Sequence, residues 1–441
     1  MSTTPASSPR RIAAPSNAGE LDRQLGLGAA TAAVVGEAIA IGIFLTPAGM
    51  ARMLGSPALI ALVWAMMGVT ALFGALCYGD LASRFPAAGG GYVYLREAYG
   101  ELPAFLYGWL SLLVMDPGLT AALAVGLMSY VAYVVPLSGM GAKLVAITII
   151  CSLGAINIFN ARAGAVFLQL TTWLKISILA SLPLFAIVFH AGHLDNLVPL
   201  ACRRPGSPPL VQAVAGATMA AFFSFGGWWD ASKLAGEVRN PRRNLPRAFI
   251  LGVVIVTLVY MLVSGAFLYV VPLEKVSSDQ AFVGQFGKAL FGELGARVLA
   301  SIVALCVLGS LSALTMSAPR AYFAMARDGV FLKSIGRPSR FGTPALAIMI
   351  QVALASLFIL VGNFETIIAY FMFPTVVFIG LTAAAIFKYS REPLRATTTI
   401  VFIVFITGVL ALTAIRSPLP AALGTGIVLM GIPVWFAVRT R

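Results

Sequence analysis

The fold is indicated by a short interruption in the first apolar stretch of the chain, Gly36-Glu37-Ala38-Ile39-Ala40-Ile41-Gly42. A second interruption, Phe225-Gly226-Gly227-Trp228, divides the sixth apolar stretch at a comparable place. Glycine lets a helix unwind, and unwound backbone is tolerated inside a bilayer only where it lines a cavity. The two interruptions therefore predict broken helices around a solute site. The alternative is that these glycines only let helices pack closely.

Composition places the chain in a membrane. Apolar residues make up 59% of the 441 residues and charged residues only 10%, which is far from the composition of soluble proteins. Apolar runs about as long as a bilayer is thick recur at 25–51, 57–78, 103–134, 143–159, 161–189, 211–235, 246–271, 295–318, 343–361, 366–387, 397–414 and 420–437. These runs predict an all-α polytopic protein with twelve spans.

Residues 1–22 are rich in Ser, Pro, Ala and Arg and contain no apolar core of a signal peptide, so we expect a disordered tail. The formal net charge is +14. With a cytoplasmic N-terminus, twenty of the 30 Lys and Arg residues fall on the inner side and eight on the outer side. This asymmetry follows the positive-inside rule. We therefore expect a plasma-membrane protein with both termini cytoplasmic, and no binding of nucleic acid.

Cysteine and histidine indicate neither a disulfide framework nor a metal site. Cys77, Cys151 and Cys306 fall in or at the ends of apolar stretches, and only Cys202 is expected in an outer loop. His190 and His193 are three residues apart but have no third ligand nearby. We expect no metal and no cofactor.

Five charged residues fall inside the apolar stretches: Glu37, Asp116, Lys175, Asp230 and Lys233. A lone charge in hydrocarbon is so unfavourable that such residues normally face a watery cavity or one another. They are therefore candidates for a solute pathway.

The two interruptions lie five spans apart, so a second five-helix unit would enter the membrane from the opposite face, as in inverted-repeat transporters. This spacing predicts a first repeat at 23–200, a second repeat at 201–390, and two additional helices at 391–441. Amphipathic segments at Tyr92–Gly100 and Ala281–Gly292 follow the second and seventh stretches and are expected on opposite sides of the membrane.

Four stretches carry a resemblance to a known family. They are Gly42–Pro47, Arg84–Gly100, Glu237–Pro246 and Pro319–Gly329. In this order they resemble the amino acid–polyamine–organocation superfamily, and most of all its bacterial permeases and L-type amino acid transporters. The resemblance covers roughly residues 25–390. It implies a LeuT-type fold of ten core helices plus two, working by alternating access.

The resemblance also implies where a solute binds. The expected binding residues are Glu37, Ile39, Ala40, Ile41 and Gly42 at the first break, Asp116, and Phe223, Ser224, Phe225, Gly226 and Asp230 at the second. Half-helix N-termini would offer N–H groups to a carboxylate. Phe223 would be the gate, unless it belongs to an aromatic stripe that packs the bundle, and Gly226 would accept the amine. The family usually has Gly-Ser-Gly where this chain has Ala40-Ile41-Gly42, which weakens the inferred carboxylate site.

Lys175 aligns with the family's lysine at the place where sodium-coupled relatives bind Na⁺. Its ammonium would bond carbonyls of the first helix and hydroxyls such as those of Ser310 or Ser312, which implies transport without sodium. The alternative is a lysine that extends to the membrane interface.

The three acids leave alternatives open. Glu37 would pair with Lys175, carry a proton, hold a cationic part of the solute, or be a neutral structural acid. Asp230 would line the site or neutralise Lys233 three residues later. Asp116 precedes Pro117, which frees a helical carbonyl, and it either lines the cavity or bonds neighbouring backbone.

The function predicted from these residues is secondary transport of an amino acid, by exchange or with protons. The alternative is transport of a cationic amine or polyamine, because the acids and the altered carboxylate motif both favour positive solutes. A solute-sensing receptor would be expected to carry a long cytoplasmic domain. No enzyme motif occurs in the spans. Val135–Ala142 has no cysteine for a disulfide-linked heavy chain, so no such partner is expected.

Overall fold

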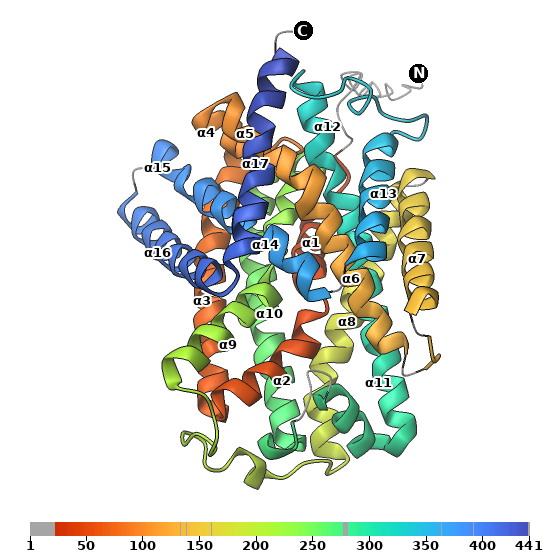
Figure 1. Ribbon diagram of the computed structural model, residues 1–441, viewed down its shortest axis with the longest axis vertical. Coiled ribbons are helices and arrows are strands. Elements are labelled where there is room, and N and C mark those ends of the chain that lie inside the picture. The colour runs from red at the N-terminus through yellow and green to blue at the C-terminus, as the bar shows by residue number, and fades with distance from the viewer. Residues whose placement is uncertain are drawn as a thin grey trace, which may run out of the picture.

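The computed structural model describes residues 23–132, 134–137, 139–159, 161–276, 281–362, 364–390 and 392–439. The expected tail at 1–22 lies outside the described residues. The described chain is helical almost throughout (Figure 1), and its one isolated β-bridge joins Leu25 to Val238.

The α-helices have the following bounds: α1 Leu27–Ala38, α2 Gly42–Leu54, α3 Pro57–Arg84, α4 Gly91–Tyr99, α5 Glu101–Leu110, α6 Asp116–Val131, α7 Gly139–Phe159, α8 Ala161–Val188, α9 Leu210–Phe225, α10 Pro241–Val270, α11 Ala281–Ser317, α12 Pro319–Arg327, α13 Ala345–Val361, α14 Phe364–Ala384, α15 Ile386–Tyr389, α16 Pro393–Arg416 and α17 Pro418–Arg439. The other helical turns are η1 Ser111–Met115, η2 Leu194–Leu197, η3 Asp230–Glu237 and η4 Leu273–Lys275.

All twelve predicted apolar stretches fall on helical segments. In the described part of the chain, ten helices are long and apolar enough to cross a bilayer, and the bent pair α1 and α2 makes eleven. The remaining stretch is α13, an apolar helix of 17 residues. The prediction of a polytopic all-helical membrane protein is confirmed.

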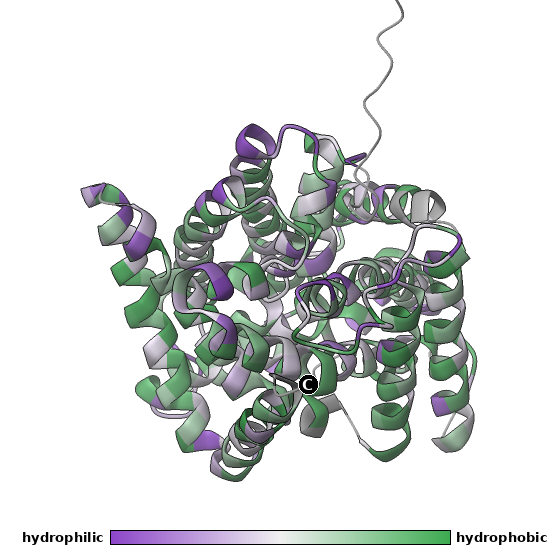
Figure 2. Ribbon diagram, turned by 90° about the horizontal axis from the view of Figure 1, so that it is seen from above, coloured by the Kyte–Doolittle hydropathy of each residue, from purple (hydrophilic) through white to green (hydrophobic). Residues whose placement is uncertain are grey.

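The outer surface of the bundle suits a lipid environment. Viewed from one end, the ribbon is mostly hydrophobic around the periphery, and the hydrophilic residues gather at the helix ends and in the loops (Figure 2). Large apolar side chains are left bare there, such as Leu62, Leu170 and Val404, which are 62%, 66% and 66% exposed. In a soluble protein this exposure would be unfavourable, whereas in a bilayer these side chains face hydrocarbon.

The third apolar stretch is not one continuous α-helix. Within it, η1 is a π-helical turn that ends at Met115, directly before Asp116 and Pro117. Pro117 has no N–H to donate to the preceding turn, so the helix widens there. The sequence indicated a freed carbonyl at this proline but not the widened turn.

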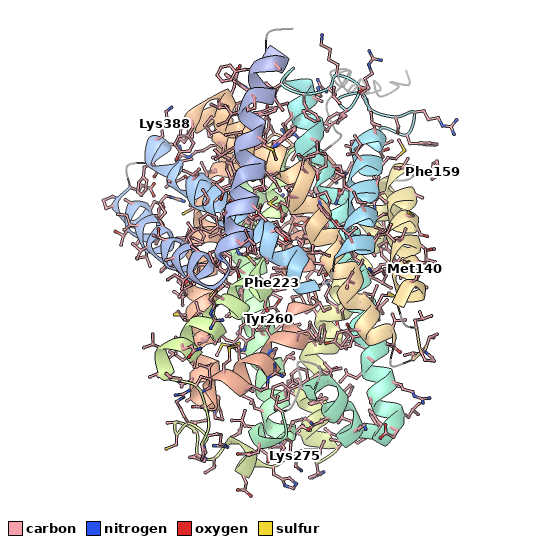
Figure 3. All side chains as sticks on the ribbon, in the orientation of Figure 1. Met140, Phe159, Phe223, Tyr260, Lys275 and Lys388 are labelled. Carbon is pink, nitrogen blue, oxygen red and sulfur yellow. The ribbon has the colours of Figure 1, made fainter. Side chains whose placement is uncertain are left out.

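Residues of three family-like stretches pack together at one end of the molecule, which we call the motif end. Arg320 Nε lies 2.9 Å from Glu237 Oε1, and the Tyr92 hydroxyl lies 2.8 Å from Asp328 Oδ2. The Leu25 N–H donates to the Glu237 carbonyl at 2.9 Å. α4, α12 and the end of α17 lie here, whereas Lys275 lies at the opposite end (Figures 1 and 3). These contacts tie the start of α1 to the segment after the second break.

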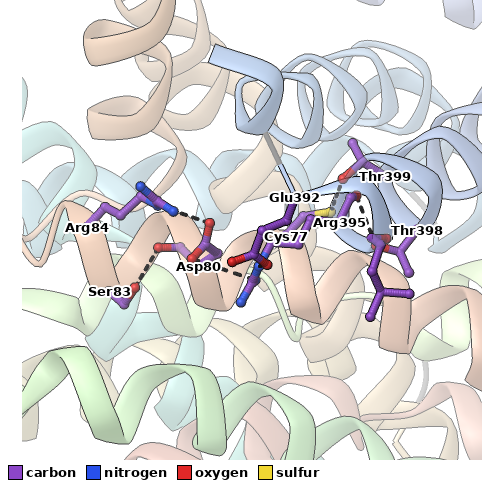
Figure 4. Close-up of polar contacts among 9 residues, drawn as sticks. Cys77, Asp80, Ser83, Arg84, Glu392, Arg395, Thr398 and Thr399 are labelled. Atoms are coloured by element: carbon purple, nitrogen blue, oxygen red, sulfur yellow. Dashed lines mark hydrogen bonds and ion pairs between the residues drawn. The ribbon is translucent and has the colours of Figure 1, made fainter. Parts of the chain in front are cut away.

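The first of the last two helices is joined to the bundle by polar contacts between α3 and α16 (Figure 4). Asp80 lies 3.0 Å from Arg84 on its own helix and 3.6 Å from Arg395. Cys77 Sγ and Thr399 Oγ1 are 3.1 Å apart. α16 therefore does not rest on α3 through apolar contacts alone.

Candidate functional site

Both predicted interruptions are breaks in the helices. α1 ends at Ala38, α2 begins at Gly42, and the two are bent by 43°. In the second break, α9 ends at Phe225 and a turn at 226–229 leads into the 3₁₀ helix η3. Glu37 lies in the last turn of α1, beside the break.

Two glycines let the broken segments touch. A Cβ on Gly42 would lie 2.6 Å from the Ser224 Cα, and one on Gly227 would lie 2.6 Å from the Glu37 carbonyl oxygen. Gly227 also has a φ of +99°, which favours glycine. These glycines are therefore needed for close approach of the two breaks, in addition to any role in unwinding.

Two hydroxyl contacts join the breaks. The Tyr260 hydroxyl on α10 lies 2.9 Å from the Ala38 carbonyl oxygen and 2.7 Å from that of Ser224. Its single proton is shared between these two acceptors. Thr46 Oγ1 and Ser224 Oγ are 2.5 Å apart. Figure 3 labels Tyr260 near Phe223, in the middle of the molecule.

A cavity of about 640 Å³, which includes the part open to solvent, lies between the breaks and helices α6 and α14. Of the residues predicted from sequence, Glu37, Ala40, Ile41, Gly42, Phe223, Ser224, Gly226 and Asp230 line it. The walls are mostly apolar, so the few polar groups decide how a solute is oriented.

Three predicted residues lie behind the cavity wall. The Ile39 side chain is fully buried, and its carbonyl faces Lys175. The Phe225 ring packs against Trp64 and Tyr260, with centroids 5.8 and 5.0 Å away. Asp116 is fully buried in an ionic cluster.

Sequence reasoning missed a whole wall of the cavity. The additional lining residues are Ala38, Met115, Leu119, Leu123, Phe222, Gly227, Trp229, Phe371, Met372, Thr375, Val376 and Ile379. Five of these belong to α14, which is predominantly apolar. Thr375 is the one polar residue among these five, and it is buried with an unbonded hydroxyl among the described residues.

Lys175 on α8 is buried, and its ammonium touches the first break. Nζ lies 3.1 Å from the Gly36 carbonyl, 2.7 Å from the Ile39 carbonyl and 2.9 Å from Ser310 Oγ. Ser310 in turn donates to the Ile39 carbonyl at 2.8 Å. Ser312 is also buried but is not among the contacts of this ammonium. The lysine does not extend to an interface.

Lys233 holds two acids together. Its Nζ lies 2.8 Å from Asp116 Oδ1 and 2.7 Å from Asp230 Oδ1. The Tyr322 hydroxyl donates to Asp116 Oδ2 at 2.8 Å. The pairing of Asp230 with Lys233 was one of the alternatives from sequence, whereas the participation of Asp116 was not. A pairing between residues 117 positions apart leaves no local sequence signal.

Glu37 differs from the other acids because the residue is only 7% exposed, yet neither of its buried carboxyl oxygens has a hydrogen-bond partner in the described structure. It does not pair with Lys175. The charged and polar groups that interact electrostatically with Glu37 are those of Asp230, Ser317, Lys233 and Asp116. Ser317 is itself buried with an unbonded hydroxyl among the described residues.

Free backbone groups lie at both breaks. At the start of α2, the N–H groups of Ile41, Gly42 and Ile43 donate to no acceptor in the described chain. On the other side, the Gly226 carbonyl receives no hydrogen bond from the described residues. An anionic group would suit the first position and a donor the second.

No group of three or more His, Cys, Asp or Glu residues that could hold a metal ion lies within the part of the chain that the structure describes. The charged groups near the cavity are Lys233 with its two acids, Lys175 against backbone carbonyls and Ser310, and Glu37 without a hydrogen-bond partner among the described residues.

Comparisons with known proteins show the family of the chain. The chain is 28% identical to b(0,+)-type amino acid transporter 1 of Mus musculus over 90% of this chain and 83% of that one. It is 29% identical to the serine/threonine exchanger SteT of Bacillus subtilis (strain 168), over 96% and 98%. It is 27% identical to large neutral amino acids transporter small subunit 2 of Homo sapiens, over 94% and 80%. Residues 25–438 match a single family, and the chain therefore belongs to the amino acid permease family.

Proposed function

We propose that this permease is a secondary transporter that carries an amino acid across the plasma membrane by alternating access. Amino acid transport is the activity named for its family and relatives, and they are transporters and not enzymes. The observation that carries the proposal is the meeting of two broken helices at one cavity, because each break offers unpaired backbone groups.

In this proposal the solute lies between the breaks. Its carboxylate accepts hydrogen bonds from the N–H groups at the start of α2, where the helix dipole also favours negative charge. Its amine donates to the Gly226 carbonyl, and Phe223 covers it. Ile41 replaces the family's hydroxyl, so the carboxylate is held by backbone groups alone, and the apolar walls from α6 and α14 surround the side chain.

The proposed architecture is a LeuT-type fold of two inverted five-helix repeats, 23–200 and 201–390, followed by two helices, with twelve spans and both termini cytoplasmic. The five-helix spacing of the breaks supports the repeats. Twenty of the 30 Lys and Arg residues fall in the segments predicted to lie on the inner side, which include the family-like stretches of the motif end. This excess supports cytoplasmic termini. The motif end would then be the cytoplasmic gate, closed by the Glu237 and Arg320 pair.

Transport in this proposal does not use sodium. The Lys175 ammonium contacts two carbonyls of the first break and Ser310, so a fixed cation stands where an ion would bind. Coupling is then by exchange or by protons. Because Val135–Ala142 has no cysteine, we propose that no disulfide-linked heavy chain is required.

The test is uptake into proteoliposomes loaded with unlabelled amino acids. Radiolabelled amino acids should enter faster than into protein-free vesicles. A thermal-shift screen of the purified protein should show which amino acids bind, since a bound solute raises the unfolding temperature. Gly28→Ala should behave as wild type in both assays, because a Cβ there meets nothing within 4 Å. If no amino acid binds or enters, the proposal is wrong.

Sodium dependence is measured in the same vesicles. Replacing NaCl outside by choline chloride should leave the initial rate nearly unchanged. Loss of most uptake in choline would contradict the role given to Lys175, although amino acid transport itself would stand.

A further inference from the structure

One part of the cavity carries more negative than positive groups. Glu37 and Asp230 line it, and Asp116 lies directly behind Asp230 in the Lys233 cluster. Lys233 is the single ammonium in contact with these acids within the described structure. Lys175 does not compensate them, because its ammonium is taken up by the Gly36 and Ile39 carbonyls and Ser310.

The carboxyl group of Glu37 has acceptors that the described chain leaves unused. Its side chain is buried, both carboxyl oxygens lack a donor among the described residues, and the Ser317 hydroxyl that faces it is unbonded there as well. Buried carboxyl groups normally have hydrogen-bond donors, and one without them is unfavourable. Because Glu37 lines the cavity, the donor that fits this position is one that enters through the cavity.

The surroundings limit the chemistry of that donor. Apart from Thr375, the cavity wall on α6 and α14 is apolar, with Leu119, Leu123 and Val376 as examples. A chain of methylene groups would contact such a wall favourably. The start of α2 offers N–H groups for a carboxylate. A solute with a carboxylate, an apolar chain and a positive end therefore matches the cavity.

We propose that Glu37, supported by Asp230 and Ser317, binds an alkylammonium group of the solute, so that this permease takes cationic amino acids. The inference rests on the proposed function, because it assumes that an amino acid occupies the cavity. Lys233 fixes Asp230 in place and leaves Glu37 as the acid with free acceptors.

The test compares L-lysine with L-norleucine, which has the same carbon chain without the terminal ammonium. Binding to wild type and to Glu37→Gln is measured by calorimetry at neutral pH. A charge-assisted hydrogen bond lost inside a desolvated site corresponds to a roughly tenfold or greater change in affinity. Glu37→Gln should weaken lysine by about that factor and leave norleucine nearly unchanged.

Glu274→Gln is the matched control. Glu274 pairs with Arg204 outside the spans and is 60% exposed, so its loss should change neither affinity. Cadaverine, which is lysine without the carboxylate, tests whether the solute is an amino acid or a simple amine. Binding of cadaverine as tight as that of lysine would mean that the solute is an amine, and it would overturn the assignment to amino acids.

Other outcomes are equally decisive. If lysine and norleucine bind wild type equally, the proposal fails even if Glu37→Gln does not fold. If Glu37→Gln alters only the pH dependence of norleucine uptake, Glu37 carries a proton and the proposal is wrong. Ser317→Ala provides a milder variant, for which a smaller, lysine-selective loss is expected. Norleucine transport without lysine binding would leave the proposed function intact, whereas no transport of any amino acid would remove both.

Discussion

Removal of one hydroxyl at Tyr260 tests whether the two breaks are held together as the structure shows. Tyr260→Phe keeps the ring, which packs against Trp64 and Phe225 with centroids 5.2 and 5.0 Å away. The substitution removes the only O–H among the described residues that reaches the carbonyls of Ala38 and Ser224. The change is therefore confined to hydrogen bonding.

The magnitude follows from what each carbonyl has left. The Ala38 carbonyl keeps a hydrogen bond from the Ala40 N–H at 3.0 Å, whereas no other donor among the described residues reaches the Ser224 carbonyl. One buried acceptor is thus left unsatisfied, which costs about 1–3 kcal/mol. We expect the free energy of unfolding to fall by that amount. Solute affinity should also fall, because the breaks lose their common anchor.

Unfolding is measured by SDS titration in mixed micelles, followed by tryptophan fluorescence. Tyr94→Phe is the matched control, because the Tyr94 hydroxyl is buried with no hydrogen-bond partner in the described structure. Its removal should leave stability unchanged or slightly higher. If Tyr260→Phe unfolds at the same SDS fraction as Tyr94→Phe and binds solute as wild type does, the hydroxyl does not anchor the breaks and the reasoning is refuted.

Three further substitutions test other contacts. Gly42→Ala should cost about 1–3 kcal/mol of stability through overpacking against Ser224 and should reduce uptake. Gly28→Ala is the control and should do neither. Equal behaviour of the two variants would contradict the close approach of Gly42 to Ser224. Lys233→Met should destabilise the protein by roughly 3–5 kcal/mol, because two buried acids lose their counter-ion. Adding Asp116→Asn should restore part of the lost stability. If it restores none, Lys233 and Asp116 are not energetically coupled. Lys175→Met should abolish most uptake while the protein still inserts, whereas Lys143→Met, at an exposed lysine, should transport normally; uptake at the wild-type rate by the first variant would exclude a coupling role.

The two breaks and the burial of Lys175 could be predicted from the sequence. The break at residues 39–41 and the turn at 226–229 follow from glycines placed inside apolar stretches, and both are local signals. Burial of Lys175 was expected for the same reason, since apolar residues surround it on both sides. The contact of its ammonium with the first break was implied by the family resemblance and could not be obtained from spacing.

The ionic cluster shows where local reasoning ends. Asp116 and Lys233 were each recognised as intramembrane charges, yet their pairing depends on how the start of α6 and η3 are placed across the bundle. The alternatives for Asp116 did not include this lysine. Asp230 was expected either to line the cavity or to pair with Lys233, and the structure places it where it does both.

The sequence by itself determined that the chain crosses a membrane, where its helices break and which residues carry charge inside it. These properties depend on composition and on neighbours along the chain, and hydrocarbon permits few alternatives. Only the tertiary structure decided that Tyr260 joins the breaks, that α14 forms a cavity wall, and that Lys233 pairs with Asp116 while Glu37 is left without a partner. Contacts of this kind join residues far apart in the chain, and their formation depends on packing geometry that no local pattern encodes.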